Sequence, residues 1–324
     1  MGLFEEQETR KPNLYPWTQD FIDSMWEGHW TPNEFSFKSD LHDFKTELTS
    51  VEQRIVVRTL SAIGQIEVAV KKFWARLGDN LPHPSITDLG LVMAGVEVIH
   101  NVGYEKLLNV LGLNDVFQEN LQTEVIGGRV KYLKKYLTRN YEDSRKQYIY
   151  ALILFTLFVE NVSLFSQFYI ILWFGRYRNV LKDTNQQVIY TRLEENIHAQ
   201  VGIKLVNVLR KEYPHLFDQE LEQRILGEAE VAYQCESKVV DWILGEFTDQ
   251  RISAAVLKEY IKDRINKSIS EIGYNKPYQI DPTLHRDFEW MIEESYGNFA
   301  TDFFHRKPVE YAKANKAYSE EDLF

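Results

Sequence analysis

Two four-residue stretches decide how this chain folds: Glu97-Val98-Ile99-His100 and Glu195-Asn196-Ile197-His198. In a helix, residues three apart share one face, so each stretch points a carboxylate and an imidazole in the same direction. Apolar residues lie within or beside both stretches, which favours faces turned toward a protein interior. A single Glu-x-x-His is usually part of a solvated helix face, but two copies in apolar surroundings predict an inward-facing site.

Two single glutamates complete the pattern. Glu67 lies on the apolar side of a predicted helix, and Glu160 lies in the most apolar part of the chain. Along the chain Glu67 precedes the first motif by 30 residues, and Glu160 precedes the second by 35. Each gap has room for one helix and its connection, or slightly more. The order is typical of ferritin-like dinuclear carboxylate proteins, in which two helices give a Glu and two give Glu-x-x-His.

The chemistry of these side chains predicts the metal. Carboxylate oxygen and imidazole nitrogen suit iron or manganese, and the lack of thiolates in the pattern argues against a structural zinc site. A site for two ions is therefore expected, with the ligands Glu67, Glu97, His100, Glu160, Glu195 and His198. The remaining histidines are expected at the surface: His29, His42, His83, His215, His285 and His305.

Composition predicts an all-α bundle with this site in its core. The chain has 324 residues, 44% of them hydrophobic, and no proline lies between Pro84 and Pro214, which suits long helices. A plausible capping box joins Ser50 and Gln53. A short helix is expected around residues 17–26. Apolar spacing predicts longer helices over residues 51–77, 87–111, 115–137, 141–174, 185–213, 218–244 and 253–272.

Charge and cysteine content exclude several classes of protein. A net charge of −11 argues against a nucleic-acid partner, because phosphate binding needs clustered Lys and Arg. Cys235 is the single cysteine, so no intrachain disulfide forms, and the first residues lack a signal-peptide pattern. A cytoplasmic protein is expected. Residues 152–175 are long enough to span a membrane, but Glu160 near the centre favours a buried helix.

At these residues the chain resembles the small subunit of class I ribonucleotide reductase. Tyr104 follows His100 by four residues, and the resemblance implies that it can carry a stable radical; an ordinary core tyrosine is the alternative. Trp30, in Trp30-Thr31-Pro32, resembles the family's relay tryptophan in the N-terminal arm. Its implied partners are His100 and the acidic residue before the second motif, which is Glu194 here and usually Asp in the family.

The resemblance also implies a domain organisation and partners. Residues 1–310 would form a ferritin-like helical domain with an N-terminal arm, and residues 311–324 a flexible tail that binds the large subunit. A tail tyrosine would continue the relay, and the sequence does not choose between Tyr311 and Tyr318. Family members are homodimers, which is expected here too.

One ligand departs from the best-known members. Those di-iron proteins have Asp at the first position, whereas members that use manganese more often have Glu, as at Glu67. The resemblance therefore implies a ribonucleoside-diphosphate reductase small subunit whose two metal ions, manganese or iron, are oxidatively activated. The stored one-electron oxidant, on the metals or on Tyr104, would pass to the large subunit for deoxyribonucleotide synthesis. Alternatives are another ferritin-like dimetal oxidase, and an iron-storage or structural helical protein.

Overall fold

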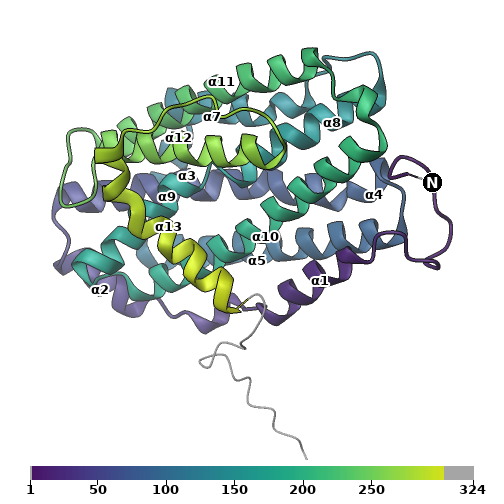
Figure 1. Cartoon of the computed structure of the whole chain (residues 1–324). Coiled ribbons are helices and arrows are strands. Elements are labelled where there is room, and N and C mark those ends of the chain that lie inside the picture. Colours follow the sequence, from purple (N-terminus) through teal and green to yellow (C-terminus); the bar gives the residue numbers. More distant parts are fainter. Residues whose placement is uncertain (1, 303–324) are drawn as a thin grey trace, which may run out of the picture. The chain divides into compact units, whose positions relative to one another are not determined.

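The two motifs lie on long helices that run side by side with several others (Figure 1). The computed structural model describes residues 2–302, apart from the side chains of residues 67–69 and 295–302. Within that part of the chain there is no strand, only an isolated bridge between Asp249 and Ile252, so the all-α prediction is confirmed. The longer helices are α1 (Trp17–Glu27), α2 (Lys38–Thr46), α3 (Ser50–Ala75), α5 (Pro84–Leu111), α6 (Asn114–Leu121), α7 (Glu124–Leu133), α8 (Ser144–Leu154), α9 (Phe165–Trp173), α10 (Lys182–Glu212), α11 (Gln219–Leu244), α12 (Ala254–Glu271) and α13 (Pro282–Asp302).

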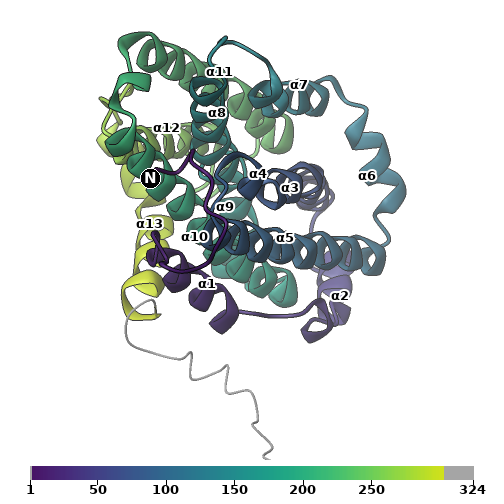
Figure 2. The same ribbon diagram turned by 90° about the vertical axis from the view of Figure 1, so that its right-hand side faces the viewer.

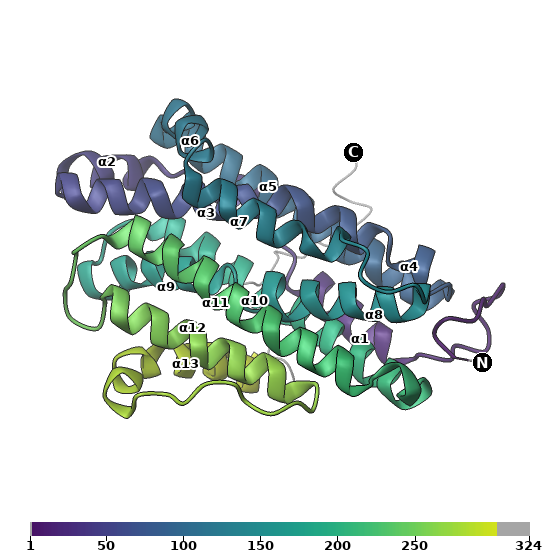
Figure 3. The same cartoon turned by 90° about the horizontal axis from the view of Figure 1, so that it is seen from above.

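The helices that carry the predicted ligands pack on one another. Helix α3 packs along α5, and α10 contacts both α5 and the short helix η3 (Phe155–Glu160), which carries Glu160. Figure 2 looks almost along the helices, with α3, α5, α9 and α10 grouped around the centre. Helices α11 and α12 pack against each other, and Figure 3 shows them side by side. These contacts belong to one compact unit up to Phe288, and a second unit begins at Glu289 within α13.

A side-chain cap fixes the start of α3. The capping box of α3 joins Thr49 and Glu52: the Glu52 amide donates to Thr49 Oγ1 at 3.3 Å, and the Thr49 amide donates to Glu52 Oε2 at 2.8 Å. The predicted Ser50–Gln53 box is therefore wrong by one residue. The Gln53 amide group instead donates to the Phe44 carbonyl at 2.8 Å, which ties α3 to the end of α2.

The predicted helix over residues 141–174 is interrupted. Helix α8 passes into a π-helical turn, η3 (Phe155–Glu160), and residues 161–164 form turns before α9 begins. The Ser163 amide donates to the carbonyl of Phe158, five residues earlier, at 3.0 Å. A π-helical turn contains more residues than an α-helical turn. No proline or glycine occurs in residues 155–164, so the sequence gives no sign of the interruption.

Other boundaries also differ from those predicted. The helix expected over residues 115–137 is broken between α6 and α7, because Thr123 is extended and its hydroxyl donates to the Asn120 carbonyl. Helices α2 and α13 were not predicted. His83 was expected at the surface but is fully buried; its ring nitrogens lie 3.0 Å from Gln7 Oε1 and 3.1 Å from the Gly2 carbonyl oxygen.

The apolar stretch that is long enough to cross a membrane lies inside the protein. It covers residues 144–178, and 94% of its most apolar 18-residue window is buried. A helix buried on all sides is apolar all round for the same reason as a membrane span. The prediction of a buried core segment is therefore confirmed.

Candidate metal centre

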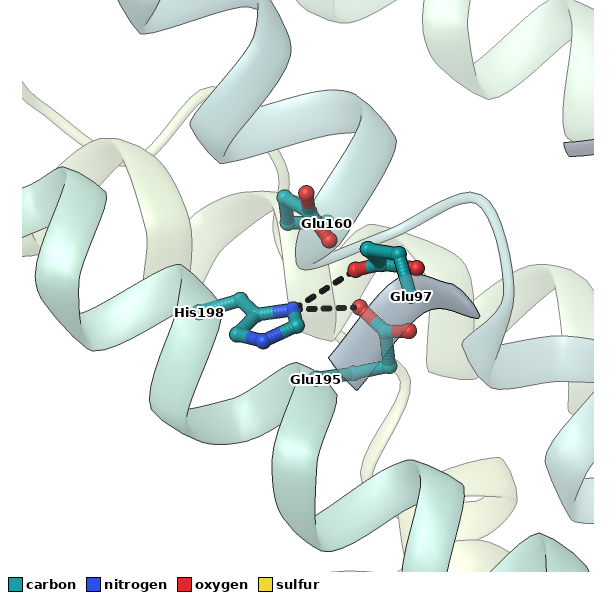
Figure 4. Close-up of side chains that lie close together, drawn as sticks. All are labelled: Glu97, Glu160, Glu195 and His198. Carbon is teal, nitrogen blue, oxygen red and sulfur yellow. Dashed lines mark ion pairs between the residues drawn. The ribbon is translucent and has the colours of Figure 1, made fainter. Parts of the chain in front are cut away.

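Four predicted ligands meet in the centre of the bundle. Glu97 comes from α5, Glu160 ends η3, and Glu195 and His198 come from α10. One ligand atom from each lies within 4.8 Å of all the others, and all four side chains are fully buried. Figure 4 shows the three carboxylates and the imidazole converging on one small volume.

The fifth predicted ligand, His100, joins the same cluster. Its Nδ1 lies 3.4 Å from Glu97 Oε2 and 3.2 Å from Glu195 Oε1, and its side chain is also fully buried. Glu67, the sixth, belongs to α3, which packs along α5; its side chain lies outside the described part of the structure. The cluster therefore combines residues from three segments that are far apart in the sequence.

The donor atoms of the cluster fit a metal ion. Among the described residues, no hydrogen-bond donor of good geometry serves either oxygen of Glu97, either oxygen of Glu195, or Oε2 of Glu160. His198 Nδ1 lies 2.8 Å from Glu97 Oε1 and 3.6 Å from Glu195 Oε2, which are ion-pair contacts. Buried carboxylates are costly unless they are paired or bind a cation. A set of ligands made up of carboxylate oxygens and imidazole nitrogens suits iron or manganese.

Burial and mutual charge shift the pKa values of the cluster residues in opposite directions. Burial, and then the charges of Glu195 and Glu97, raise the pKa of Glu160 well above its usual range. Burial alone would lower the pKa of His198, but Glu195 and Glu97 outweigh it and raise the pKa to about 9. Burial would also raise the pKa of Glu195, but the neighbouring imidazoles lower it. Protons therefore balance the carboxylates when no cation is bound, and a metal ion would displace them.

A hydrogen-bonded line runs outward from the cluster. Glu194 Oε2 accepts from Trp30 Nε1 at 2.8 Å and lies 2.7 Å from His100 Nε2. The rings of Trp30 and His100 are stacked, with centroids 6.2 Å apart and planes at 21°. A carboxylate at Nε2 favours the tautomer that turns the Nδ1 lone pair toward the cluster. A single oxygen of Glu194 therefore contacts both the Trp30 indole and the His100 imidazole.

Tyr104 is buried on the same helix as the first motif. It follows His100 by one turn of α5 and is 2% exposed. Its hydroxyl donates to Thr191 Oγ1 on α10 at 3.4 Å. The phenol is therefore shielded from solvent and linked to the helix of the second motif.

Several contacts of the site were missed by sequence reasoning. Trp74 Nε1 donates to Glu160 Oε1 at 2.5 Å, and Tyr190 packs on Trp30 with ring centroids 6.0 Å apart. Two glycines permit close approaches. A Cβ at Gly103 would lie 3.1 Å from the Trp30 indole, and a Cβ at Gly202 only 2.1 Å from Thr156 Oγ1 on η3. A glycine within a long predicted helix was the available signal.

Fold and site together define a class: a helical bundle that buries a carboxylate and histidine cluster able to hold metal, as in ferritin-like proteins. Within that class, the family model described as "Ribonucleotide reductase, small chain" matches residues 9–285. The chain belongs to this family.

Known proteins are similar to this chain in sequence or in fold. The chain is 25% identical to a probable ribonucleoside-diphosphate reductase small subunit of Invertebrate iridescent virus 3, over 97% of this chain and 86% of the viral one. Its fold matches the ribonucleotide reductase R2 subunit from Clostridium botulinum with a TM-score of 0.79, at 18% identity over 91% of this chain and 94% of that one. It also matches an R2-like ligand-binding oxidase mutant with a Mn/Fe cofactor, with a TM-score of 0.70, at 17% identity over 83% and 99% of the two chains.

Replacing a ligand tests the site. Glu97→Ala or His198→Ala should each lower the metal bound per chain by at least one ion, because each removes a donor that the remaining cluster does not replace. Elemental mass spectrometry of metal-loaded protein measures this. His215→Ala, at an exposed histidine, is the matched control and should bind as much metal as wild type. Full metal content in both ligand variants would refute the assignment.

Proposed function

We propose that the cluster, with Glu67, holds two metal ions, and that this small subunit stores a one-electron oxidant and passes it to the large subunit. The observation that carries the proposal is the buried line from His100 through Glu194 to Trp30. Bound at this cluster, a pair of redox-active ions supplies the oxidising equivalent. Manganese is the preferred candidate because of Glu67, and a Mn/Fe cofactor occurs in a protein of the same fold.

The chain's own residues control protons along this line. Glu194 accepts the indole N–H of Trp30 and faces His100 Nε2. When Trp30 gives up an electron, its N–H becomes more acidic, and the carboxylate can take that proton without water. The stacked rings of Trp30 and His100 bring the indole next to a cluster ligand. We therefore assign Trp30 as the relay residue and Glu194 as its proton acceptor.

Tyr104 is the candidate for a radical stored away from the metals. Its hydroxyl proton is held toward Thr191 in a buried setting. Exclusion of water prevents side reactions of a reactive group. The same burial would protect an oxidant on the metals, so both storage sites are compatible with the geometry.

Replacing the relay residue tests the proposed function. Trp30→Phe keeps an aromatic ring but removes both the donor to Glu194 and the easily oxidised indole. With the large subunit present, ribonucleotide reduction should fall to background, while metal content stays at the wild-type level. Trp26→Phe is the control, because Trp26 belongs to the same arm but is 59% exposed. Wild-type turnover in the Trp30→Phe variant would exclude the relay.

A second function is another dimetal oxidase of this fold, and the structural likeness to a ligand-binding oxidase favours it as the runner-up. Such an enzyme would act on a substrate at the metals and would not need a C-terminal tail. The tail therefore separates the two functions. Residues 311–324, including Tyr311 and Tyr318, lie outside the described residues, so their role remains a proposal.

Deleting residues 311–324 should abolish binding to the large subunit and leave the metal content unchanged. The acidic segment ends in Leu323-Phe324, and short peptides of this kind dock apolar side chains in a groove. Binding is measured by sedimentation of mixed subunits. Unchanged association after the deletion would place the large-subunit contact elsewhere on the chain. A full-length chain that does not associate with the large subunit would favour the oxidase.

We also propose that two copies of the chain associate through α5. Three apolar residues are exposed on one stripe of this helix, at steps of seven and four: Leu91 (55%), Val98 (50%) and Val102 (47%). Exposed apolar stripes mark interaction sites. A symmetric pair would bury the same stripe on both copies.

Val98→Glu should convert the dimer to a monomer, because it places a charge at the centre of the stripe. Light scattering during size-exclusion chromatography gives the mass. Leu137→Glu, at a 67% exposed apolar residue of the short helix η2 (Lys134–Leu137), is the control and should leave the dimer intact. A dimer of wild-type affinity in the Val98→Glu variant would exclude this face.

A further inference from the structure

The chain leaves its helix immediately after the ligand Glu160. Residues 161–164 form turns in the protein interior, and all four are buried. Ser163 closes the π-helical turn, with its amide and its hydroxyl both donating to the Phe158 carbonyl, at 3.0 and 2.6 Å. Carbonyl groups in such a break lack regular helical partners and need other donors when buried.

A buried arginine from α12 serves the first of these carbonyls. Arg264 Nε donates to the Asn161 carbonyl oxygen at 2.9 Å, and its Nη2 donates to the Asn161 side-chain oxygen. The guanidinium lies over the Phe165 ring, 3.6 Å from the centroid. Asn161 Nδ2 in turn donates to Ser268 Oγ on α12 at 2.6 Å. The residue that follows Glu160 is thus fixed to α12 through both its backbone and its side chain.

A second buried arginine, from α7, serves the end of the break. Arg129 Nη2 donates to the Ser163 carbonyl oxygen and to Gln167 Oε1, the latter at 2.9 Å. Its Nη1 donates to the Ala62 carbonyl oxygen of α3 at 2.8 Å. Its charge is balanced by Glu236 on α11, with Nε to Oε1 at 2.9 Å. Arg129 therefore links the broken segment to two further helices.

We propose that Arg264 and Arg129 are positioning residues that set how Glu160 enters the metal cluster. Both guanidinium groups donate to backbone carbonyls within three residues of Glu160. If the break closed into a regular α-helix, each residue gained or lost would turn Glu160 by about 100° relative to α9. Trp74 Nε1 donates to Glu160 Oε1, so Oε2 remains for a metal ion. The inference rests on the proposed metal site.

The direct test is a double-mutant cycle on Mn(II) binding to the metal-free protein, followed by the electron paramagnetic resonance signal of free Mn(II). Arg264→Met keeps the aliphatic bulk and removes the donors. It should weaken Mn(II) binding about tenfold, the scale found when outer partners of metal ligands are lost. In a Glu160→Gln background the same change should have almost no effect, because the ligand that it positions is already lost. Arg264→Lys should recover part of the affinity, since an ammonium can still reach the Asn161 carbonyl.

Two further variants keep the test independent of folding. Arg129→Met combined with Glu236→Met removes both buried charges together, because an unpaired Glu236 would unfold the protein for another reason; it should also weaken Mn(II) binding. Arg58→Met is the matched control, since Arg58 donates to a carbonyl, that of Trp242, away from the break. Circular dichroism verifies that each variant is helical.

The outcomes separate the inference from the function. Wild-type Mn(II) affinity in Arg264→Met, or equal losses in the presence and absence of Glu160, overturns the positioning role alone. A wild-type protein that binds no Mn(II) or Fe(II) overturns the proposed metal site and this inference with it.

Discussion

Carboxylates held in a dry interior impose the constraint on which the rest of this structure depends. Glu97, Glu160 and Glu195 occupy a volume that water does not reach. Three charges in such a place repel one another and lack solvation, so the protein needs either bound protons or bound cations. The raised pKa of Glu160 and the lowered pKa of Glu195 show how bound protons can balance the charges. A pair of metal ions would balance them instead. Long helices meet the geometric demand, because each places ligands at a fixed depth in the bundle.

The same constraint explains the local irregularities around the site. A regular helix through residues 155–165 would satisfy its own backbone but would turn Glu160 in another direction. The helix instead passes into a π-helical turn and ends after Glu160. Buried arginines then donate hydrogen bonds to the carbonyl groups that have lost their helical partners. Close packing around the site depends on glycines. The side chain of Thr156 packs directly against Gly202, and the indole of Trp30 packs against Gly103.

What the sequence could predict was set by local periodicity. The two Glu-x-x-His motifs lie on α5 and α10 as expected, because three-residue spacing has a fixed meaning in a helix. The break after Glu160 was missed, since a buried stretch is apolar whether it is wound as an α-helix or a π-helix. The contacts of Trp74, Arg129 and Arg264 were missed because they join residues 34 to 103 positions apart, for which one sequence carries no periodic signal. The capping box differed by one residue, an ordinary uncertainty at helix ends.

The most direct measurement is the metal content of the purified protein by elemental mass spectrometry, together with an electron paramagnetic resonance spectrum after exposure to oxygen or superoxide. Two ions per chain with a new paramagnetic signal are predicted. A coupled multiline signal from two manganese ions would place the oxidant on the metals, and a tyrosyl signal with two irons would place it on Tyr104. Protein that takes up neither manganese nor iron, and gives no signal, would contradict the claim that this cluster stores an oxidant.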